Sequence, residues 1–432
     1  MIDYKRRLLN LIPGGAHTYS RGFDQFPDNA PQILKRGKGA YVYDPDDKEY
    51  LDYGMALRSV ILGYANKYVN QAAINAIELG NNLTRPSLIE LEAAELLVSI
   101  IDSAEMVKFA KNGSNVTTAA VKLARAYTGR KLIARCAQHP FFSFDDWFIG
   151  STVMNKGVPE EISNMTKLFN YNDIESLEKL FDEYPNQIAC VILEPATGDM
   201  EPKDSFLHKV KELCDKNGAL FILDEMITGF RWYLKGAQYY YNVEPHLCTF
   251  GKAMANGFSV AALAGKKEFM KLGSILPEGQ ERVFLLSTTH GAEMSSLAAF
   301  IATSKFMEEN NVIEHIWGYG KKLIEGFNKI SSHYGVSDYI YMTGVPCSPV
   351  YYTLDNDKKV SLEFRTLFNQ ELINKGVLMP WVALSFSHDE EELQKTFDAL
   401  EHAIKIYKLA LEGGIDKYLK SKVIKPVFRR YN

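Results

Sequence analysis

Residues 188–195, Ile-Ala-Cys-Val-Ile-Leu-Glu-Pro, and residues 220–225, Leu-Phe-Ile-Leu-Asp-Glu, decide the fold that this sequence predicts. Each stretch is a short apolar run that ends in an acidic residue. A strand that is apolar at every position is typical of a sheet that is buried on both faces. Between the two runs, the apolar spacing of residues 206–217 predicts an amphipathic helix. The segment therefore reads as strand, helix, strand.

The same alternation continues on both sides of this segment. Helices are expected at residues 115–128 and 174–184, and further strands at 131–135 and 246–250. Strands that alternate with helices predict an α/β fold with a mostly parallel sheet. In such sheets, ligands collect at the carboxyl ends of the strands.

The 432 residues are enough for two or three structural units. We expect a large domain over residues 66–305 and a smaller α+β domain over residues 306–432, with residues 1–65 as an N-terminal part of the small domain. Within the N-terminal part, aromatic residues around a Pro/Asp turn predict a hairpin at residues 41–52. The expected C-terminal helices are residues 306–330, 361–375 and 389–411, and short strands are expected around residues 339–353.

Composition narrows the classes of partner. Apolar residues make up 46% and charged residues 24%, as in ordinary globular proteins. A net charge of −4 favours neither nucleic acid nor an anionic membrane as a partner. No apolar run reaches the roughly 18 residues that a membrane span needs, and the N-terminus does not read as a secretory signal. Five scattered cysteines predict neither disulfides nor a metal site, so a cytoplasmic location is expected.

Two strand ends carry residues that could take part in catalysis. Asp224 closes one apolar run, and Lys252 follows the strand at residues 246–250. A carboxylate and a lysine at neighbouring strand ends suit pyridoxal phosphate (PLP), because the amine forms an imine with the cofactor aldehyde and the carboxylate keeps the pyridine nitrogen protonated. The alternatives are that Asp224 and Glu225 cap a helix or bind a metal, and that Lys252 is a solvated surface residue.

A third feature suits the cofactor phosphate. Residues 111–116, Lys-Asn-Gly-Ser-Asn-Val, precede the helix expected at residues 115–128. A turn that opens a helix presents backbone N–H groups and the positive end of the helix dipole to an anion. The alternative is an ordinary N-cap made by Ser114.

Taken in order, these motifs resemble those of class III (subgroup II) PLP-dependent aminotransferases, especially the members related to glutamate-1-semialdehyde 2,1-aminomutase. The matching stretches are Asn112-Gly-Ser-Asn-Val, Glu194-Pro-Ala-Thr-Gly, Leu223-Asp-Glu-Met-Ile-Thr-Gly-Phe-Arg and Thr249-Phe-Gly-Lys-Ala. The resemblance implies PLP as cofactor and the fold of type I PLP-dependent transferases, which is aspartate aminotransferase-like. It also implies a homodimer with shared active sites.

The resemblance assigns roles at the matching positions. Lys252 would be the imine lysine and proton shuttle, and Asp224 would pair with the pyridine nitrogen. The remaining cofactor-binding positions are Gly113, Ser114 and Asn115 at the phosphate, Met226 beneath the ring, Glu194, and Thr288 reaching the phosphate from the partner subunit. His139 is expected to stack on the ring, with Phe141 as a rival and a purely structural role for His139 left open.

Three positions are expected to contact substrate. Arg21 matches an arginine that binds the substrate carboxylate in the aminomutase, as a guanidinium fork can. Arg58, which follows Leu57, and Trp381 replace a glycine and a glutamate of the aminomutase pocket. These departures favour a different substrate, larger or carrying another anionic group, although Arg58 also suits a surface ion pair.

The resulting prediction is an aminotransferase that moves an amino group from a donor such as glutamate to an aldehyde or ketone acceptor. The alternative within the same chemistry is glutamate-1-semialdehyde 2,1-aminomutase, which transfers the amine within one molecule. A non-catalytic regulator with this fold would be expected to lack Lys252 or Asp224. An unrelated oxidoreductase is disfavoured because no G-x-G-x-x-G follows the first strand. The sequence does not name the acceptor.

Overall fold

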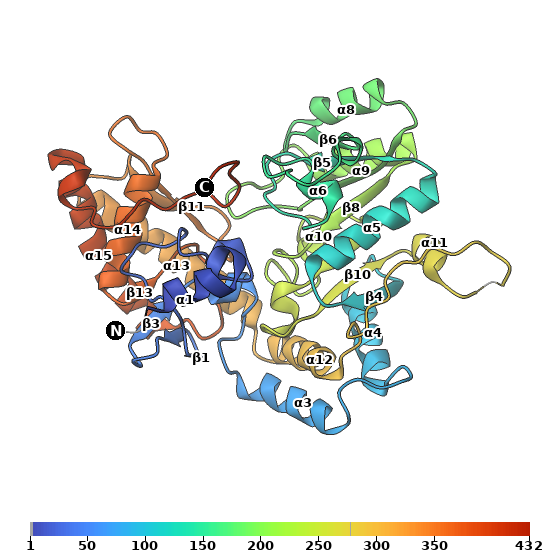
Figure 1. Cartoon of the computed structure of the whole chain (residues 1–432), viewed down its shortest axis with the longest axis horizontal. Coiled ribbons are helices and arrows are strands. Elements are labelled where there is room, and N and C mark those ends of the chain that lie inside the picture. The colour runs from blue at the N-terminus through green and yellow to red at the C-terminus, as the bar shows by residue number, and fades with distance from the viewer. Residues whose placement is uncertain (1–2, 277) are drawn as a thin grey trace. The chain divides into compact units, whose positions relative to one another are not determined.

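A computed structural model describes residues 3–276 and 278–432 and divides into two compact units (Figure 1). Unit 1 combines the chain up to Asn66 with Glu314–Arg429. Unit 2 comprises Lys67–Ile313 together with the last three residues. The boundary that the sequence suggested between residues 305 and 306 therefore lies between Ile313 and Glu314.

Unit 2 is built on a seven-stranded sheet in the order β4-β10-β9-β8-β7-β5-β6. Its strands are β4 (Met106–Ala110), β5 (Leu132–Cys136), β6 (Thr166–Phe169), β7 (Ile188–Leu193), β8 (Leu220–Asp224), β9 (Leu247–Phe250) and β10 (Ala261–Gly265). All neighbouring pairs are parallel except those of β10, which runs antiparallel to β4 and β9. The prediction of an α/β fold with a mostly parallel sheet is confirmed.

The helices of unit 2 follow the apolar spacing of the sequence. They are α3 (Lys67–Glu78), α4 (Leu88–Ile100), α5 (Gly113–Thr128), α6 (Asp146–Ile149), α7 (Glu160–Ser163), α8 (Ile174–Glu183), α9 (Phe206–Asn217), α10 (Ala237–Tyr240), α11 (Lys267–Met270) and α12 (Met294–Glu309). Helix α9 and strand β7 have the predicted bounds. Leu207 of α9 packs in one buried cluster with Val191 and Phe221 of the sheet, which explains the continuous apolar runs.

The prediction of one helix at residues 306–330 is wrong. The structure has two helices there, α12 and α13 (Val312–His333), separated by Asn310 and Asn311. Asn311 adopts a left-handed conformation with φ 50°, which asparagine tolerates better than most residues. The Asn310 side chain donates to the carbonyl oxygen of Phe306 at 2.9 Å and so satisfies an end group of α12. Apolar spacing runs across the break and conceals it.

Unit 1 contains a four-stranded sheet in the order β1-β2-β3-β13. The strands are β1 (Arg36–Lys38), β2 (Tyr41–Tyr43), β3 (Glu49–Asp52) and β13 (Val377–Leu378), and a separate hairpin joins β11 (Ile340–Thr343) to β12 (Val350–Thr353). The hairpin predicted at residues 41–52 is confirmed as β2 and β3, which pair antiparallel. The helices are α1 (Tyr4–Leu11), α2 (Met55–Arg58), α13 from Glu314 onward, α14 (Leu362–Asn374) and α15 (Glu390–Gly413). None of the helices in the described parts of the chain is long and apolar enough to span a bilayer.

The loop after β8 is anchored by a fully buried carboxylate. Glu225 accepts hydrogen bonds from the Thr228 hydroxyl at 2.6 Å and from the backbone N–H groups of Ala237 and Gln238, both at 2.8 Å. The last two donors open α10, so Glu225 caps this short helix across a long loop. A Cβ on Gly236 would lie only 2.7 Å from the carboxylate oxygen, so the loop needs glycine there. Of the two adjacent acids, Glu225 therefore has the capping role that the sequence left open.

Replacing Glu225 should therefore destabilise unit 2. Glu225→Ala leaves three buried donors without an acceptor, and each costs about 1–3 kcal/mol. We expect the apparent thermal unfolding temperature to fall clearly, and Glu225→Gln to lose less because its amide oxygen still accepts. The exposed Glu183→Ala is the control and should change the unfolding free energy by less than about 0.5 kcal/mol. Equal unfolding temperatures for Glu225→Ala and the control would contradict the anchoring role.

Candidate active site

The carboxyl ends of the parallel strands bring the predicted cofactor residues of unit 2 to one edge of the sheet. Asp224 ends β8 beside Thr249 of β9, and Lys252 follows β9 directly. Glu194 follows β7, which pairs with β8 on the other side. His139 lies in the loop after β5, the next strand along the sheet. Parallel pairing is the reason that residues far apart in the sequence reach a common edge.

Asp224 is a buried carboxylate with few hydrogen bonds. It is 2% exposed and accepts hydrogen bonds from the Met226 N–H at 3.1 Å and from the Thr249 hydroxyl at 3.0 Å. Burial raises its pKa to about 6, against the opposing effect of the positive charge of Lys252 and of the two hydrogen bonds. Because burial makes the ionised carboxylate costly, Asp224 is suited to an additional positively charged partner.

Lys252 begins a short 3₁₀ helix, Lys252–Ala255, and is half-buried. Its φ is 42°, in the left-handed region that non-glycine residues rarely occupy. Such a conformation costs of order 1–3 kcal/mol and persists only where the surrounding structure enforces it. The strain fixes where the amine leaves the backbone, and the charge of Lys252 is felt at Asp224.

Met226 is packed between two glycines that the sequence placed in separate motifs. A Cβ added to Gly113 would lie 2.9 Å from the Met226 sulfur, and one added to Gly251 would lie 2.7 Å from it. Only glycine lets the turn before α5 and the turn before Lys252 approach Met226 this closely. The three motifs therefore form one compact cradle.

The first turn of α5 offers an anion site. Asn112, rather than Ser114, is the N-cap, because its side-chain oxygen accepts the Asn115 N–H at 3.0 Å. The Ser114 hydroxyl is buried and instead accepts the Phe144 N–H at 3.0 Å. The N–H groups of Gly113 and Ser114 have no acceptor within the helix and carry the positive end of its dipole.

His139 is buried and neutral. It is 1% exposed, and its Nδ1 accepts the backbone N–H of Glu194 at 3.0 Å. Burial lowers its pKa to about 3, helped by the charge of Arg135, so the proton of the neutral ring lies on Nε2. This Nε2 has no hydrogen-bond partner among the described residues. Phe141, the rival for ring stacking, is 47% exposed.

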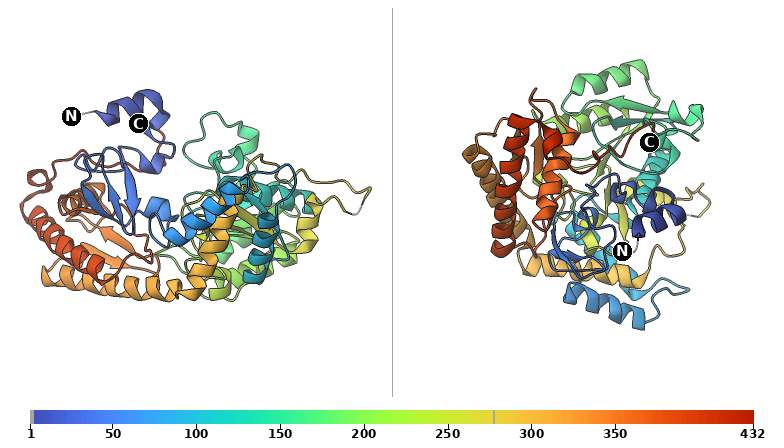
Figure 2. Two further views of the ribbon diagram at one scale, coloured as in Figure 1. Left: turned by 90° about the horizontal axis from the view of Figure 1, so that it is seen from below. Right: turned by 60° about the vertical axis from the view of Figure 1, so that its left-hand side comes forward.

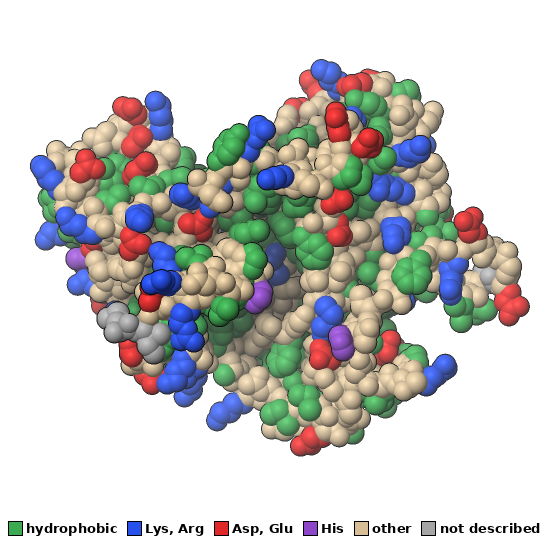
Figure 3. Space-filling view, in the orientation of Figure 1, with side chains coloured by type: hydrophobic (Ala, Val, Ile, Leu, Met, Phe, Trp, Pro, Cys, Tyr) green, Lys and Arg blue, Asp and Glu red, His purple; other side chains and the backbone are tan. Residues whose placement is uncertain are grey.

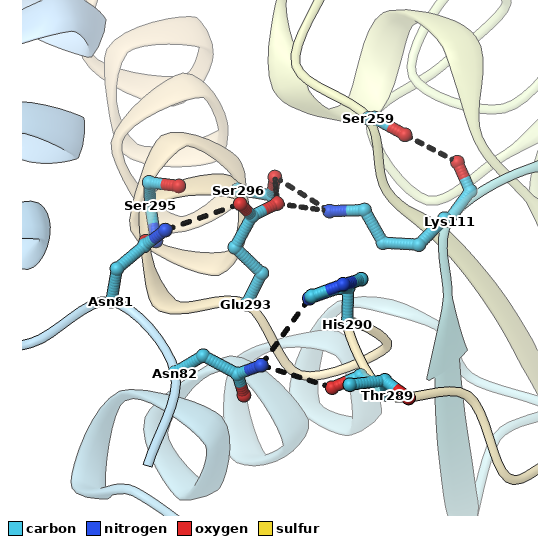
Figure 4. Close-up of polar contacts among 9 residues, drawn as sticks. All are labelled: Asn81, Asn82, Lys111, Ser259, Thr289, His290, Glu293, Ser295 and Ser296. Carbon is cyan, nitrogen blue, oxygen red and sulfur yellow. Dashed lines mark hydrogen bonds and ion pairs between the residues drawn. The ribbon is translucent and has the colours of Figure 1, made fainter.

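The loop that carries Thr288 is tied to the turn before α5. Lys111 donates to Glu293 at 2.5 Å, which links the end of β4 to the start of α12 (Figure 4). The Asn82 side chain donates to the carbonyl oxygen of Thr289 at 3.0 Å. Thr288 itself is exposed on this braced loop. The bracing holds the loop in place while leaving the threonine accessible.

Unit 1 gathers two of the three predicted substrate residues in one cavity of about 700 Å³. Arg21 and Trp381 both line it, together with Leu57, whereas Arg58 is not among the lining residues. Arg21 ends a 3₁₀ turn and is exposed. Burial raises the pKa of Asp52, and three hydrogen bonds and the positive charge of Arg21 oppose this shift.

Leu57 and Arg58 belong to a left-handed helical turn. Four consecutive non-glycine residues, 55–58, have φ between 39° and 68°. Left-handed helix costs about 1–2 kcal/mol for each such residue. The Asp52 carboxylate stabilises the turn by accepting the N–H groups of Gly54 at 2.8 Å and Met55 at 3.1 Å.

Two aromatic side chains also make hydrogen bonds at this left-handed turn. The Tyr64 hydroxyl donates to Asp52 at 2.6 Å and accepts the Ala56 N–H at 2.9 Å. The Trp381 ring nitrogen donates to the carbonyl oxygen of Gly54 at 2.9 Å. Burial and the adjacent Asp52 raise the pKa of Tyr64, so its hydroxyl remains protonated and able to donate.

Sequence reasoning missed several of these residues. Thr249 was part of a recognised motif but was not assigned a contact with Asp224. Nothing in the sequence pairs Lys111 with Glu293, since they lie 182 positions apart. Asp52 and Tyr64 were not singled out either, because a left-handed turn of non-glycine residues leaves no mark in the apolar spacing of the sequence.

Comparisons with known proteins agree with this geometry. A family model described as Aminotransferase class-III matches residues 24–404. Glutamate-1-semialdehyde 2,1-aminomutase from Alkaliphilus oremlandii (strain OhILAs) is 33% identical over 418 residues, which cover 92% of this chain and 96% of that protein. The corresponding enzyme from Francisella philomiragia subsp. philomiragia is 32% identical over 411 residues, 90% of this chain and 94% of that protein.

Solved structures show the same fold. The FumI protein of Sphingopyxis sp. MTA144, in its PLP internal aldimine form, is 27% identical with a TM-score of 0.86, covering 95% of this chain and 97% of that one. A glutamate-1-semialdehyde-aminomutase from Pseudomonas aeruginosa PAO1 has a TM-score of 0.81 at 19% identity, with 94% of each chain covered. The family match and the curated relatives span most of the chain, so this protein belongs to the class-III family of PLP-dependent aminotransferases.

Proposed function

We propose that this aminotransferase works in two half-reactions, in which a donor such as glutamate gives up its amino group and an aldehyde or ketone acceptor receives it. Asp224 and Lys252 are the catalytic residues of the proposal. The observation that carries it is their arrangement: a buried carboxylate with a pKa near 6 that feels the charge of a conformationally strained lysine at the adjacent strand end.

The residues at this edge of unit 2 fit PLP. Free N–H groups at the start of α5 suit a phosphate, and the cradle of Gly113, Met226 and Gly251 lets the backbone come close to a flat ring. Asp224 offers an ionisable carboxylate to a protonated ring nitrogen. His139 holds a buried N–H without a partner among the described residues. PLP, when bound, supplies the electron sink that makes a proton on the amino-bearing carbon removable.

Lys252 then moves that proton. Its amine would hold the cofactor in the resting enzyme, and the same amine would take the proton from the substrate carbon and return it at the second reaction position. Asp224 favours the same steps by keeping the ring nitrogen protonated.

The other predicted positions complete the proposal. Gly113, Ser114 and Asn115 would hold the phosphate and the neutral His139 would stack on the ring, while Glu194 supports His139 through its backbone N–H. Arg21 binds a substrate carboxylate in the unit 1 cavity, and Trp381 forms part of its wall. Arg58 remains a predicted substrate contact, since it belongs to the same left-handed turn as Leu57. A cytoplasmic location is proposed as well, and all five cysteines are buried free thiols, as expected in a reducing compartment.

A homodimer with shared active sites is part of the proposal. Thr288, expected to reach the phosphate of the partner subunit, is exposed. The described segment that follows α11 extends away from the rest of unit 2 in Figure 1 and in the left-hand view of Figure 2. It carries Ile275, Leu276 and Phe284, which are 66–73% exposed, and hydrophobic side chains on the projection are visible in Figure 3. Exposed apolar side chains on a projecting segment are typical of a protein interface.

Asp224 should make PLP binding depend on pH. Its pKa of about 6 lies above the ordinary 3.8, so folding gains from this group below pH 3.8 and loses that gain as pH rises through 6. PLP binding has the opposite dependence, because only the ionised carboxylate holds a protonated ring nitrogen. We expect the PLP dissociation constant of the apoenzyme to rise by up to about tenfold per pH unit below pH 6. Asp224→Asn should bind PLP more weakly and flatten this dependence; an unchanged profile in this variant would remove the role.

Absorbance spectra of the PLP-loaded enzyme test the first half-reaction. Adding L-glutamate without an acceptor should convert the pyridoxal form to the pyridoxamine form. Lys252→Ala should retain PLP noncovalently and lose this conversion by at least about 10³-fold, because no group moves the proton. Conversion at the wild-type rate in Lys252→Ala would contradict the proposal. If glutamate has no effect but glutamate 1-semialdehyde turns over, the enzyme is an aminomutase.

The projecting segment should be needed for dimerisation. The triple change Ile275→Ser, Leu276→Ser and Phe284→Ser removes its exposed apolar surface, and we expect sedimentation velocity to show a shift from dimer to monomer with weaker PLP binding. Val360→Ser, which changes an equally exposed apolar residue of unit 1, serves as the control and should leave the dimer intact. A triple variant that sediments like wild type would show that the segment is not an interface.

A further inference from the structure

The residue that precedes the phosphate turn (residues 112–115) is held from two sides. Lys111 lies between β4 and this turn. Its carbonyl oxygen accepts the Ser259 hydroxyl at 2.7 Å, which fixes its backbone from the loop before β10. Its side chain extends to the start of α12, where the amine donates to the Glu293 carboxylate at 2.5 Å and to the Ser296 hydroxyl at 3.0 Å (Figure 4). Lys111 therefore joins three segments that are far apart in the sequence.

The ion pair between Lys111 and Glu293 is charged and partly shielded from water. The two side chains are 21% and 29% exposed. The hydrogen bond from Lys111 lowers the pKa of Glu293 against the opposing effect of burial, and the charge of the lysine adds to the decrease. Glu293 is therefore ionised at neutral pH. Because breaking a partly buried pair leaves the remaining charge poorly solvated, each side chain holds the other in place.

Glu293 also helps to fix the loop that carries Thr288, called here the Thr288 loop (residues 286–293). The second carboxylate oxygen of Glu293 accepts the Asn81 side-chain amide at 3.1 Å, and the Asn81 side-chain oxygen accepts the Ser295 N–H at 3.0 Å. Within the loop, the Thr288 side chain lies against Gly291, where a Cβ would be only 2.5 Å from the threonine hydroxyl oxygen. The position of this hydroxyl is therefore set by the short stretch of backbone that ends at Glu293.

We propose that Lys111 and Glu293 are positioning residues for the cofactor phosphate, because their ion pair fixes the Thr288 loop relative to the phosphate turn and so connects the phosphate site of one subunit with that of its partner. The proposal rests on the homodimer proposed above, in which the phosphate turn serves the subunit's own site and Thr288 serves the partner's. Neither member of the ion pair contacts the phosphate in this scheme.

A direct contact between the Lys111 amine and the phosphate is the rival explanation. Positioning is favoured because two of the three N–H groups of the amine already donate to Glu293 and Ser296. The two explanations predict effects of opposite sign for Glu293→Gln. Loss of the carboxylate would free the amine and strengthen phosphate binding if Lys111 bound the phosphate directly, whereas it weakens phosphate binding if the pair positions Thr288.

Equilibrium binding of PLP and of pyridoxal to the apoenzyme tests the proposal without turnover. Pyridoxal lacks the phosphate, so the ratio of the two dissociation constants separates the phosphate contribution from general effects on the fold. We expect Lys111→Met and Glu293→Gln each to lower the preference for PLP by about threefold or more, and the double variant to lose no more than either single variant. Lys111→Arg keeps the charge and the donors and should retain most of the preference.

Two further variants identify the route of the effect. Thr288→Ala should lower the preference for PLP, and adding Lys111→Met to it should cause no further loss, because the ion pair acts through Thr288. Lys235→Met, which breaks a different ion pair of unit 2 with Asp102, is the control and should leave the preference unchanged. Thermal unfolding of each variant identifies those that fail to fold.

Mixed dimers test the connection between the subunits. The absorbance of PLP attached to Lys252 reports only on a subunit that retains this lysine. When one subunit carries both Lys111→Met and Lys252→Ala and its partner is unchanged, we expect the unchanged subunit to bind PLP more weakly. When Lys111→Met is instead in the subunit that retains Lys252 and the partner carries Lys252→Ala, we expect the affinity of a mixed dimer in which Lys111 is intact.

Three results would overturn the proposal: an unchanged ratio of PLP to pyridoxal affinity in Lys111→Met, stronger PLP binding by Glu293→Gln, and weakening confined to the subunit that carries Lys111→Met. Thr288→Ala separates this failure from failure of the proposed function. If Thr288→Ala lowers the preference for PLP and Lys111→Met does not, only the role of the ion pair is wrong. If Thr288→Ala binds PLP like the wild type, the proposed phosphate contact of Thr288 is wrong as well.

Discussion

Burial of the Asp224 carboxylate is the constraint on which the cofactor edge of unit 2 depends. Placing an acid at the end of a buried strand costs free energy, and two hydrogen bonds do not fully compensate it, as its raised pKa shows. The compensation comes from positive charge, first from Lys252 at the neighbouring strand end. Glu225, the next residue, is equally buried but has three donors of its own and serves the backbone. Adjacent carboxylates thus have different functions because their hydrogen-bond environments differ.

The parts of the fold that the sequence predicted are those governed by periodic burial. Strand β7 and helix α9 have the expected bounds because every strand position and one helix face contact the same apolar cluster. The order of the apolar runs also predicted that Asp224 and Lys252 follow neighbouring strands, since parallel strands end at one edge of the sheet. Asp224 and Lys252 were therefore identified together.

The parts that were not predicted depend on single polar contacts. Asn310 and Asn311 interrupt a helix without interrupting the apolar spacing. Asn112 caps α5 rather than Ser114, which was the alternative to a phosphate site, because the Ser114 hydroxyl accepts the N–H of Phe144 instead. A local motif does not reveal which of two polar side chains has a better partner elsewhere. The turn at residues 55–58 is a further case, since the side chains that stabilise it come from both of the chain segments that form unit 1.

That turn also bears on how this family member can change over time. Most mutations in a pocket wall are constrained by packing, but here the backbone conformation also matters, since all four residues have a positive φ that favours glycine. Loss of the Leu57 side chain would relax the chain while enlarging the cavity. Relief of backbone strain and retention of a narrow cavity therefore act in opposite directions at Leu57, whose side chain lies on the cavity wall. Drift toward a more robust protein would be drift toward a less discriminating one.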